Sequence, residues 1–310
     1  MSEKLFARML ESYEALPFAG KAVALQGGEP LLATPEILAR LNDSRINKSL
    51  QTNATLITDE TAAMLGRGNW LVGVSIDGDE LANRLRTKPG GSRAFDDIVN
   101  GIRRLECAGV DYNLMTVVSR ANVDRAAEIY RYLRDNFSTR YHQYIECTGS
   151  QAEIDGKQWG RFLIELFDEW IANDARTVSI RIFDSIVSTL LGGPPTQCSF
   201  AGTCRQYLVV EHDGNVYPCD FHVRDDLKLG NIATHSWREL SESPVYQAFA
   251  DGKAKGLPDE CRQCEFFIFC RGDCPRNRVG GNPRLCAGWK QFFAHSLPKL
   301  RKLLQTVRGN

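Results

Sequence analysis

Segments with the apolar pattern of strands alternate with segments that have the apolar pattern of helices along the N-terminal two thirds of the chain. A short apolar run at 22–25 suits a buried strand, and further strands are predicted at 49–53, 71–77, 112–119 and 141–147. Before and between these runs, apolar residues recur at the spacing of amphipathic helices near 2–16, 59–65, 95–108 and 123–137. Repeated strand–helix units with continuous apolar strands are typical of a parallel sheet or barrel that is covered by helices.

The rest of the chain predicts a mixture of helix, strand and hairpin. Residues 159–170 carry large apolar side chains on one helical face, which indicates core packing, and 178–183 is predicted to be a further strand. The segments 207–211 and 215–218 are predicted to form a β-hairpin, because Asp213-Gly214 lies near the turn. Thr34 is expected to cap a helix that begins with Pro35.

Polar and glycine-rich motifs follow three consecutive predicted strands. Gln26-Gly27-Gly28-Glu29-Pro30 comes after the first, Gln51-Thr52-Asn53 closes the second, and Ser75-Ile76-Asp77-Gly78 closes the third. Parallel α/β folds bind ligands at the carboxyl ends of their strands. A strand-end glycine often serves only the turn. Three such motifs in consecutive units nevertheless favour a ligand-binding rim.

Eight of the ten cysteines lie between residues 198 and 286. Four of them form the pattern Cys-x2-Cys-x5-Cys-x3-Cys, and four more flank it: Cys261, Cys264, Cys270 and Cys274 in the pattern, with Cys198, Cys204, Cys219 and Cys286 around it. Eight thiols are two sets of four, enough to close two cysteine-ligated sites. Iron–sulfur clusters and zinc ions both satisfy that count, and the spacing alone leaves both open. Cys107 and Cys147 fall outside the pattern and are interpreted as small buried hydrophobes.

Length and charge narrow the class of protein. The 310 residues leave room for two domains, and 38 basic residues balance 38 acidic ones, which argues against a nucleic-acid binder. No apolar run is long enough to cross a bilayer, and the N-terminus lacks the pattern of a signal peptide, so we expect a cytoplasmic chain without a membrane partner. In a reducing compartment, ten cysteines indicate metal ligands or reactive thiols rather than disulfides.

With these motifs, the sequence resembles radical S-adenosylmethionine (SAM) enzymes with a SPASM-type C-terminal domain, and most closely the anaerobic sulfatase-maturating enzymes. The resemblance covers nearly the whole chain. Besides the cysteines, it rests on the stretches 25–32 (LQGGEPLL), 47–56 (NKSLQTNATL), 71–78 (LVGVSIDG), 112–118, 198–204 (CSFAGTC), 211–221 (EHDGNVYPCDF) and 229–232 (LGNI). It implies three parts: a partial (β/α)6-type parallel barrel that lacks its first strand (1–190), a SPASM domain with a β-hairpin (191–295) and a C-terminal helix or tail (296–310).

The resemblance also implies which residues bind ligands. In this family the GGEP motif supports the amino group of SAM, and a cationic amine suits carbonyl oxygens and a carboxylate. The implied contacts are Gly27, Gly28, Glu29, Ser75 and Arg86 for the cofactor and Gln26 for the substrate. One auxiliary [4Fe–4S] cluster would be held by Cys198, Cys204, Cys219 and Cys274, and the other by Cys261, Cys264, Cys270 and Cys286.

Asp220 resembles the general base of the family. In the implied reaction, a 5′-deoxyadenosyl radical removes a Cβ hydrogen from a cysteine or serine of a sulfatase. Loss of the thiol or hydroxyl proton then lets a second electron leave, and the product becomes formylglycine. The implied partners are a sulfatase polypeptide and an electron donor such as flavodoxin or ferredoxin. The alternative role for Asp220 is to cap a turn, because aspartate is common in loops.

The sequence departs from the family at its start. Relatives carry Cys-x3-Cys-x2-Cys before the first helix, and this motif holds the cluster that cleaves SAM, whereas the first cysteine here is Cys107. We expect a truncated chain, since a crossover helix without its strand leaves the strand at 22–26 with an unpaired edge. A third [4Fe–4S] cluster would then belong to a full-length form. The alternatives are a non-catalytic protein that binds a peptide or sulfatase, and another SPASM-type peptide-modifying enzyme.

Overall fold

The computed structural model describes residues 1–33 and 35–308. The chain divides into two compact units, each built from segments that are distant in sequence. The cysteine-rich unit comprises Met1–Val23, Ala33–Asn47 and Cys198–Pro283, and the sheet unit comprises Ala24–Leu32, Lys48–Gln197 and Arg284–Asn310. Most of the strand-end motifs therefore belong to one unit and most of the cysteines to the other.

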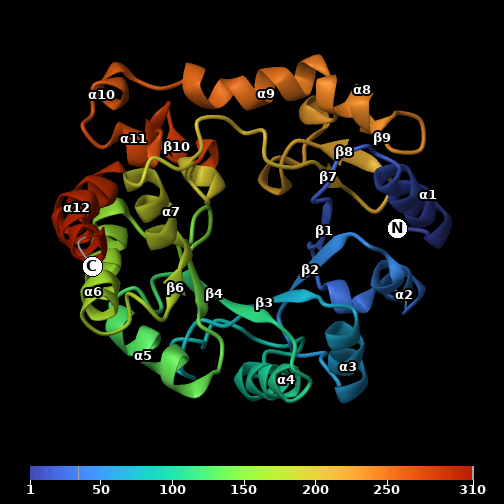
Figure 1. Cartoon of the computed structure of the whole chain (residues 1–310), viewed down its shortest axis with the longest axis horizontal. Helices are drawn as coiled ribbons and strands as arrows, with labels where there is room; N and C mark the ends of the chain where they lie inside the picture. The colour runs from blue at the N-terminus through green and yellow to red at the C-terminus, as the bar shows by residue number, and fades with distance from the viewer. Residues whose placement is uncertain (34, 309–310) are drawn as a thin grey trace. The chain divides into compact units, whose positions relative to one another are not determined.

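A six-stranded sheet in the order β1-β2-β3-β4-β5-β6 organises the strand–helix repeats (Figure 1). Its strands are β1 (Ala22–Leu25), β2 (Asn47–Thr52), β3 (Leu71–Ser75), β4 (Tyr112–Val118), β5 (Tyr141–Glu146) and β6 (Ser179–Ile180). The pairs from β2 to β6 are parallel. Sequential order with parallel pairing confirms the predicted α/β class.

Helices join the strands and cover one face of the sheet. They are α3 (Asp59–Arg67), α4 (Phe95–Cys107), α5 (Ala126–Asn136) and α6 (Gly156–Asn173), and α7 (Arg181–Leu190) follows the last strand and contacts β5 and β6. Along β4, buried residues alternate with half-buried ones, because successive side chains of a strand point to opposite faces. Leu114 and Val118 are fully buried, whereas Met115 and Val117 belong to the less covered face. That open face leads to the carboxyl ends of the strands.

Helix α12 (Cys286–Arg308) packs very closely on α6. A Cβ atom on Gly288 would lie 1.9 Å from the carbonyl oxygen of Gly156, and a Cβ on Gly160 would lie 2.7 Å from the Cα of Gly288. Only glycine allows the two backbones to approach this far. The contact fixes the first turn of α12, where Cys286 lies.

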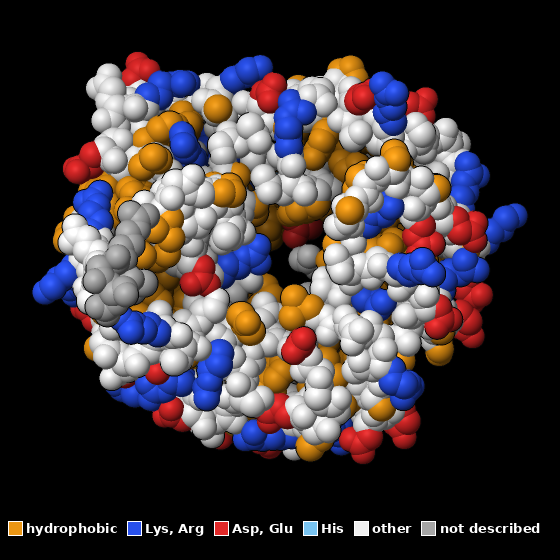
Figure 2. Space-filling model, in the orientation of Figure 1, with side chains coloured by type: hydrophobic (Ala, Val, Ile, Leu, Met, Phe, Trp, Pro, Cys, Tyr) orange, Lys and Arg blue, Asp and Glu red, His pale blue; other side chains and the backbone are white. Residues whose placement is uncertain are grey.

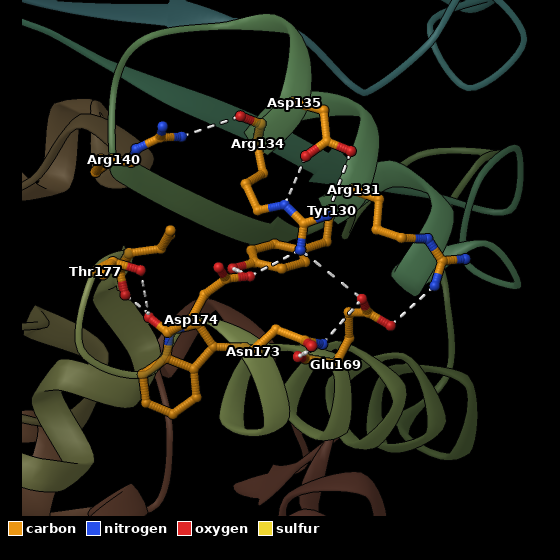
Figure 3. A network of polar contacts seen from close by, with 11 residues as sticks. Tyr130, Arg131, Arg134, Asp135, Arg140, Glu169, Asn173, Asp174 and Thr177 are labelled. Atoms are coloured by element: carbon orange, nitrogen blue, oxygen red, sulfur yellow. Dashed lines mark hydrogen bonds and ion pairs between the residues drawn. The ribbon is translucent and has the colours of Figure 1, made fainter.

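A polar network ties α5 to the C-terminal end of α6 (Figure 3). Asp174 accepts hydrogen bonds from the Oη of Tyr130 at 2.8 Å and from Nη1 of Arg134 at 2.9 Å, and Arg131 pairs with Glu169 at 2.9 Å. Burial and the hydrogen bond to Asp174 both raise the pKa of Tyr130. These contacts hold neighbouring crossover helices in register outside the sheet.

The cysteine-rich unit combines short elements. Its strands are β7 (Val209–Val210), β8 (Asn215–Tyr217) and β9 (Gly230–Asn231) in one antiparallel sheet, and β10 (Arg278–Val279) with β11 (Asn282–Pro283) in another. Its helices are α1 (Glu3–Glu14), α2 (Pro35–Asp43), α8 (Trp237–Glu242), α9 (Pro244–Lys255), α10 (Asp259–Arg262) and α11 (Phe267–Cys270). The predicted hairpin is confirmed with shorter strands. The predicted cap Thr34 lies outside the described residues.

Two element predictions need correction. The strand predicted at 178–183 extends only over Ser179–Ile180, and α7 begins at Arg181. Buried Ile182, Phe183 and Ile186 recur at helical spacing, so packing selects a helix here. The C-terminal helix, expected from 296, already begins at Cys286. A short apolar run cannot by itself separate a strand from a buried helical turn.

The surface carries charges of both signs. On the face drawn in Figure 2, Lys and Arg side chains are interspersed with Asp and Glu side chains, in keeping with the balanced composition. Within residues 1–33 and 35–308, no helix is long and apolar enough to span a membrane.

Candidate functional site

A glycine turn follows β1 at the carboxyl edge of the sheet. Gly27 has φ +84° and Gly28 has φ +54°, a conformation that residues with a Cβ rarely adopt. The space around both glycines is open, so backbone conformation rather than crowding requires glycine here. Gln26 is exposed directly before the turn. The turn therefore presents bare backbone to a ligand.

The carboxylate of Glu29 joins this turn to the end of β2. Its Oε1 accepts hydrogen bonds from Oγ1 of Thr52 at 2.7 Å and from the backbone N–H of Leu31 at 3.2 Å. Its Oε2 accepts from the backbone N–H of Asn53 at 2.9 Å. A carboxylate offers about four acceptor positions. Glu29 is thus fixed by three neutral donors, which leaves acceptor capacity for a cationic amine.

Ser75, at the end of β3, is connected to the second motif. Its Oγ accepts a hydrogen bond from Nε2 of Gln51 at 2.9 Å. The Oε1 of Gln51 lies 2.1 Å from where a Cβ on Gly73 would stand, so the missing side chain makes room for the amide. Sequence reasoning did not single out Gly73, although a glycine inside a strand is a known sign of close approach.

Arg86 is held by Asp77. Its Nε and Nη2 donate to the two carboxylate oxygens, each at 2.8 Å, and the backbone N–H of Val117 donates to Oδ1 of Asp77 at 2.9 Å. Asp77 is only 6% exposed. The pair occupies two of the five N–H donors of the guanidinium. Asp77 thereby positions Arg86 between β3 and β4, a role that the sequence did not reveal.

Asp220 lies in a separate polar cluster of the cysteine-rich unit. Its Oδ1 accepts a hydrogen bond from the Oη of Tyr207 at 2.7 Å, and the Sγ of the neighbouring Cys219 lies 3.4 Å from the same oxygen. Burial, followed by the hydrogen bond to Asp220, raises the pKa of Tyr207. The tyrosine therefore stays a protonated donor to the carboxylate. The sequence pattern around Tyr207 did not indicate that this tyrosine would contact Asp220.

All ten cysteines are free thiols, and the interpretation of Cys107 and Cys147 as buried is wrong, because Cys107 is exposed and Cys147 is half-buried. Seven of the eight pattern cysteines lie in the cysteine-rich unit, and Cys286 opens α12 in the sheet unit. Burial raises the pKa of Cys204, that of Cys219 to about 11, and that of Cys274 to about 12. Thiolates at these positions consequently need a cation to compensate their charge. Binding a metal would supply it and release the protons.

The chemistry of the donor set, eight thiols, suits [4Fe–4S] clusters and zinc ions alike, because thiolates are the ligands of both. Across the described ranges, no three His, Cys, Asp or Glu side chains are gathered closely enough to hold one metal ion.

Two family models match the chain. The model of the radical SAM superfamily matches residues 1–133, and the model of the SPASM iron–sulfur cluster-binding domain matches residues 198–265. The SPASM match favours iron–sulfur clusters over zinc ions as the groups that the cysteines bind. The two matches lie on the segments that carry the glycine turn and most of the cysteine array.

Curated relatives match over most of their length. The chain is 31% identical to the serine-type anaerobic sulfatase-maturating enzyme of Bacteroides thetaiotaomicron, over 96% of this chain and 81% of the relative. It is 33% identical to the cysteine-type enzyme of Clostridium perfringens, over 92% of this chain and 84% of the relative. The two relatives differ in the residue type named for them.

A solved structure matches nearly the whole fold. Native anSMEcpe with bound AdoMet and Cp18Cys peptide superimposes with a TM-score of 0.91 at 30% sequence identity, covering 99% of this chain and 92% of that chain. That protein therefore contains, in one fold, a site for SAM and a site for a peptide. The similarity extends through both units.

Proposed function

Because this chain belongs to the anaerobic sulfatase-maturating enzymes of the radical SAM superfamily, we propose specific roles for its residues in oxidising a sulfatase cysteine or serine to formylglycine. The enzyme class is radical SAM oxidoreductase, and its cofactors are SAM and [4Fe–4S] clusters. The observation that carries the proposal is the identity above 30% over more than four fifths of two maturases. The individual residue roles rest on the geometry described above.

The sheet edge binds SAM in this proposal. The Gly27–Gly28 backbone and the Glu29 carboxylate receive the cationic amine, since Glu29 is anchored by neutral donors. Ser75 contacts the cofactor from the next strand end, and Arg86 offers its remaining N–H groups to the cofactor carboxylate. Bound SAM supplies, on reductive cleavage, the radical that removes the Cβ hydrogen of the target residue.

Gln26, exposed directly before the glycine turn, faces the substrate peptide. Asp220 accepts the thiol or hydroxyl proton of the target, which lets the second electron leave. Tyr207 holds the acceptor carboxylate in place with its 2.7 Å hydrogen bond. Whether the target is cysteine or serine stays open, because the relatives include both types.

Two auxiliary clusters, when bound, would supply an acceptor for that electron. One is held by Cys198, Cys204, Cys219 and Cys274, and the other by Cys261, Cys264, Cys270 and Cys286. All eight are free thiols, and burial raises the pKa of Cys204 and Cys274. The substrate is a sulfatase polypeptide, the electron donor is a flavodoxin or ferredoxin, and free thiols in this number suit the cytoplasm.

Cofactor and cluster binding are tested on residues 1–310, and turnover on the protein expressed from its full reading frame. The anaerobically purified chain should be brown, contain roughly eight iron atoms from two four-iron clusters, and bind SAM in isothermal titration calorimetry. Colourless protein with stoichiometric zinc would overturn the cluster assignment.

For turnover, the complete protein is incubated with SAM, a reductant and sulfatase peptides that differ only in carrying cysteine or serine at the target. Formylglycine detected by mass spectrometry supports the proposed reaction and identifies the target. Peptide binding without any modification would support a non-catalytic binder, and a thioether or other crosslink would support a different peptide-modifying reaction. Either of these two results overturns the proposal.

A further inference from the structure

Lys253, on the last turn of α9, is a fully buried lysine. Its side chain is 1% exposed, although lysine is almost never buried unless its charge is paired. Its Nζ donates to the carbonyl oxygens of Ser199 at 2.7 Å and Cys198 at 3.1 Å. It thus binds the backbone that carries the first cysteine of the array, rather than a carboxylate.

The same face of α9 fastens the following residues of that segment. The carbonyl oxygen of Ala250 accepts a hydrogen bond from the backbone N–H of Cys204 at 3.1 Å. Ala250 and Lys253 are three residues apart and therefore lie on one helical face. Two cysteines of the proposed ligand set are consequently held by one helix.

Arg278 extends the attachment to a third cysteine. Its Nη1 donates to the carbonyl oxygen of Lys253 at 2.7 Å, its Nε to that of Gly272 at 3.0 Å, and its Nη2 to that of Asp273 at 3.2 Å. The Oδ1 of Asp273 accepts the backbone N–H of Cys274 at 2.6 Å. Cys198, Cys204 and Cys274 are therefore connected through a network centred on Lys253.

We propose that Lys253 is a positioning residue for the auxiliary cluster of Cys198, Cys204, Cys219 and Cys274, fixing the ligand loops and raising the reduction potential of the cluster. The inference rests on the cluster assignment of the proposed function. Charge, hydrogen bonds and burial around a cluster set its potential. A buried ammonium beside thiolates favours the more negative, reduced cluster, and partners outside the ligand shell orient the ligands themselves.

The test compares Lys253→Met, Lys253→Arg and the control Lys255→Met in anaerobically reconstituted protein. Methionine keeps the length of the side chain but removes its charge and donors, whereas Lys255 is exposed on the same helix. The iron content reports how fully the two clusters are loaded. A redox titration monitored by electron paramagnetic resonance reports their reduction potentials. Lys253→Met should lower the reduction potential of one of the two clusters. We expect the equilibrium constant for its reduction to fall about tenfold, which corresponds to about 59 mV for one electron. Lys253→Arg keeps the positive charge, so its potentials should stay close to those of the wild type. Lys255→Met should have the wild-type potentials.

A second measurement applies if Lys253→Met binds too little iron for its reduction potentials to be measured. Hydrogen exchange in the iron-free chains should be about tenfold faster in Lys253→Met than in the wild type at the amides of 198–204. The amides of 141–146 in β5 should be unchanged. Wild-type potentials in an iron-loaded Lys253→Met, or unchanged exchange in an iron-free one, overturn the role of Lys253. A wild-type chain that binds no iron instead overturns the cluster assignment.

Discussion

Tyr207 donates a hydrogen bond of 2.7 Å from its Oη to the Oδ1 of Asp220. The bond fixes the orientation of a carboxylate at the first residue of a short 3-10 helix (Asp220–His222), directly after Cys219. Because burial and Asp220 itself raise the pKa of Tyr207, the tyrosine keeps its proton at any physiological pH. Tyr207 can therefore orient the proposed base without competing with it for the substrate proton.

The role of Asp220 as a base predicts a selective loss of product. In the complete enzyme, Asp220→Asn should lower the rate of formylglycine formation by about 10²–10⁴, the usual contribution of a general base. Cleavage of SAM, measured as 5′-deoxyadenosine, should continue. Asp226→Asn is the matched control, because Asp226 is an exposed carboxylate nearby that pairs with Arg224. Equal formylglycine yields from Asp220→Asn and the wild type would remove Asp220 as the base.

The orienting role of Tyr207 predicts a smaller effect. Tyr207→Phe removes the hydroxyl but keeps the ring, so the carboxylate loses one fixed partner and samples more orientations. We expect formylglycine formation to fall by about tenfold, equivalent to about 1.4 kcal/mol, with the amount of 5′-deoxyadenosine unchanged. Rates are measured in single turnover. If Tyr207→Phe reduces both products equally, the tyrosine supports the fold rather than the base.

The proposed contact between Glu29 and the amine of SAM predicts an effect on cofactor binding. Glu29→Gln keeps an acceptor oxygen for Thr52 but removes the negative charge that the cationic amine needs. Losing a hydrogen bond to a charged group costs about 1.5–3 kcal/mol, so SAM affinity should fall about ten- to hundredfold. The measurement is calorimetric titration with SAM. Glu36→Gln, an exposed glutamate on α2, should bind like the wild type. Unaltered affinity in Glu29→Gln would contradict the proposed amine contact.

The strand-end motifs were predictable because parallel strands bring their carboxyl ends to one edge. The contacts of Glu29 with Thr52 and Asn53 confirm that the first two motifs meet. Other features depend on tertiary packing that no local pattern encodes. Lys253 has the sequence context of a solvated helix terminus, yet it is 1% exposed. The apolar run at 178–183 could suit a strand or a helix, and only burial of Phe183 and its neighbours selects the helix.

The contact between α6 and α12 predicts a strong effect of a single methyl group. Gly288→Ala would place a Cβ 1.9 Å from the Gly156 carbonyl oxygen, so the helices must separate. We expect a loss of roughly 1–3 kcal/mol in the free energy of unfolding, as overpacking usually costs. Gly252→Ala on α9 meets no atom within 4 Å and should be neutral or slightly stabilising. Thermal melting compares the two. Equal melting temperatures for Gly288→Ala and the wild type would show that the helices do not pack this closely.

Buried His142 predicts how stability depends on pH. Its side chain is 2% exposed, and neither ring nitrogen has a hydrogen-bond partner among the residues that the structure describes. Burial, with a smaller contribution from Arg140, lowers the pKa of His142 to about 4, against an ordinary value of 6.5, while the backbone of Thr139 and, more weakly, Asp174 act in the opposite direction. The folded protein therefore favours the neutral ring. Its contribution to stability is complete above pH 6.5 and is lost progressively as the pH falls toward 4.

The size of this loss is roughly 3 kcal/mol at most, since one pKa unit corresponds to about 1.36 kcal/mol. Melting temperatures of the wild type should fall between pH 7 and pH 5, and those of His142→Phe should fall less, because phenylalanine has no proton to gain. His212→Asn, at an exposed histidine, should keep the wild-type dependence. Comparing variants cancels the pH dependence of the clusters, which all of them share. Parallel curves for His142→Phe and the wild type would mean that His142 is hydrated, and that water reaches the covered face of β5.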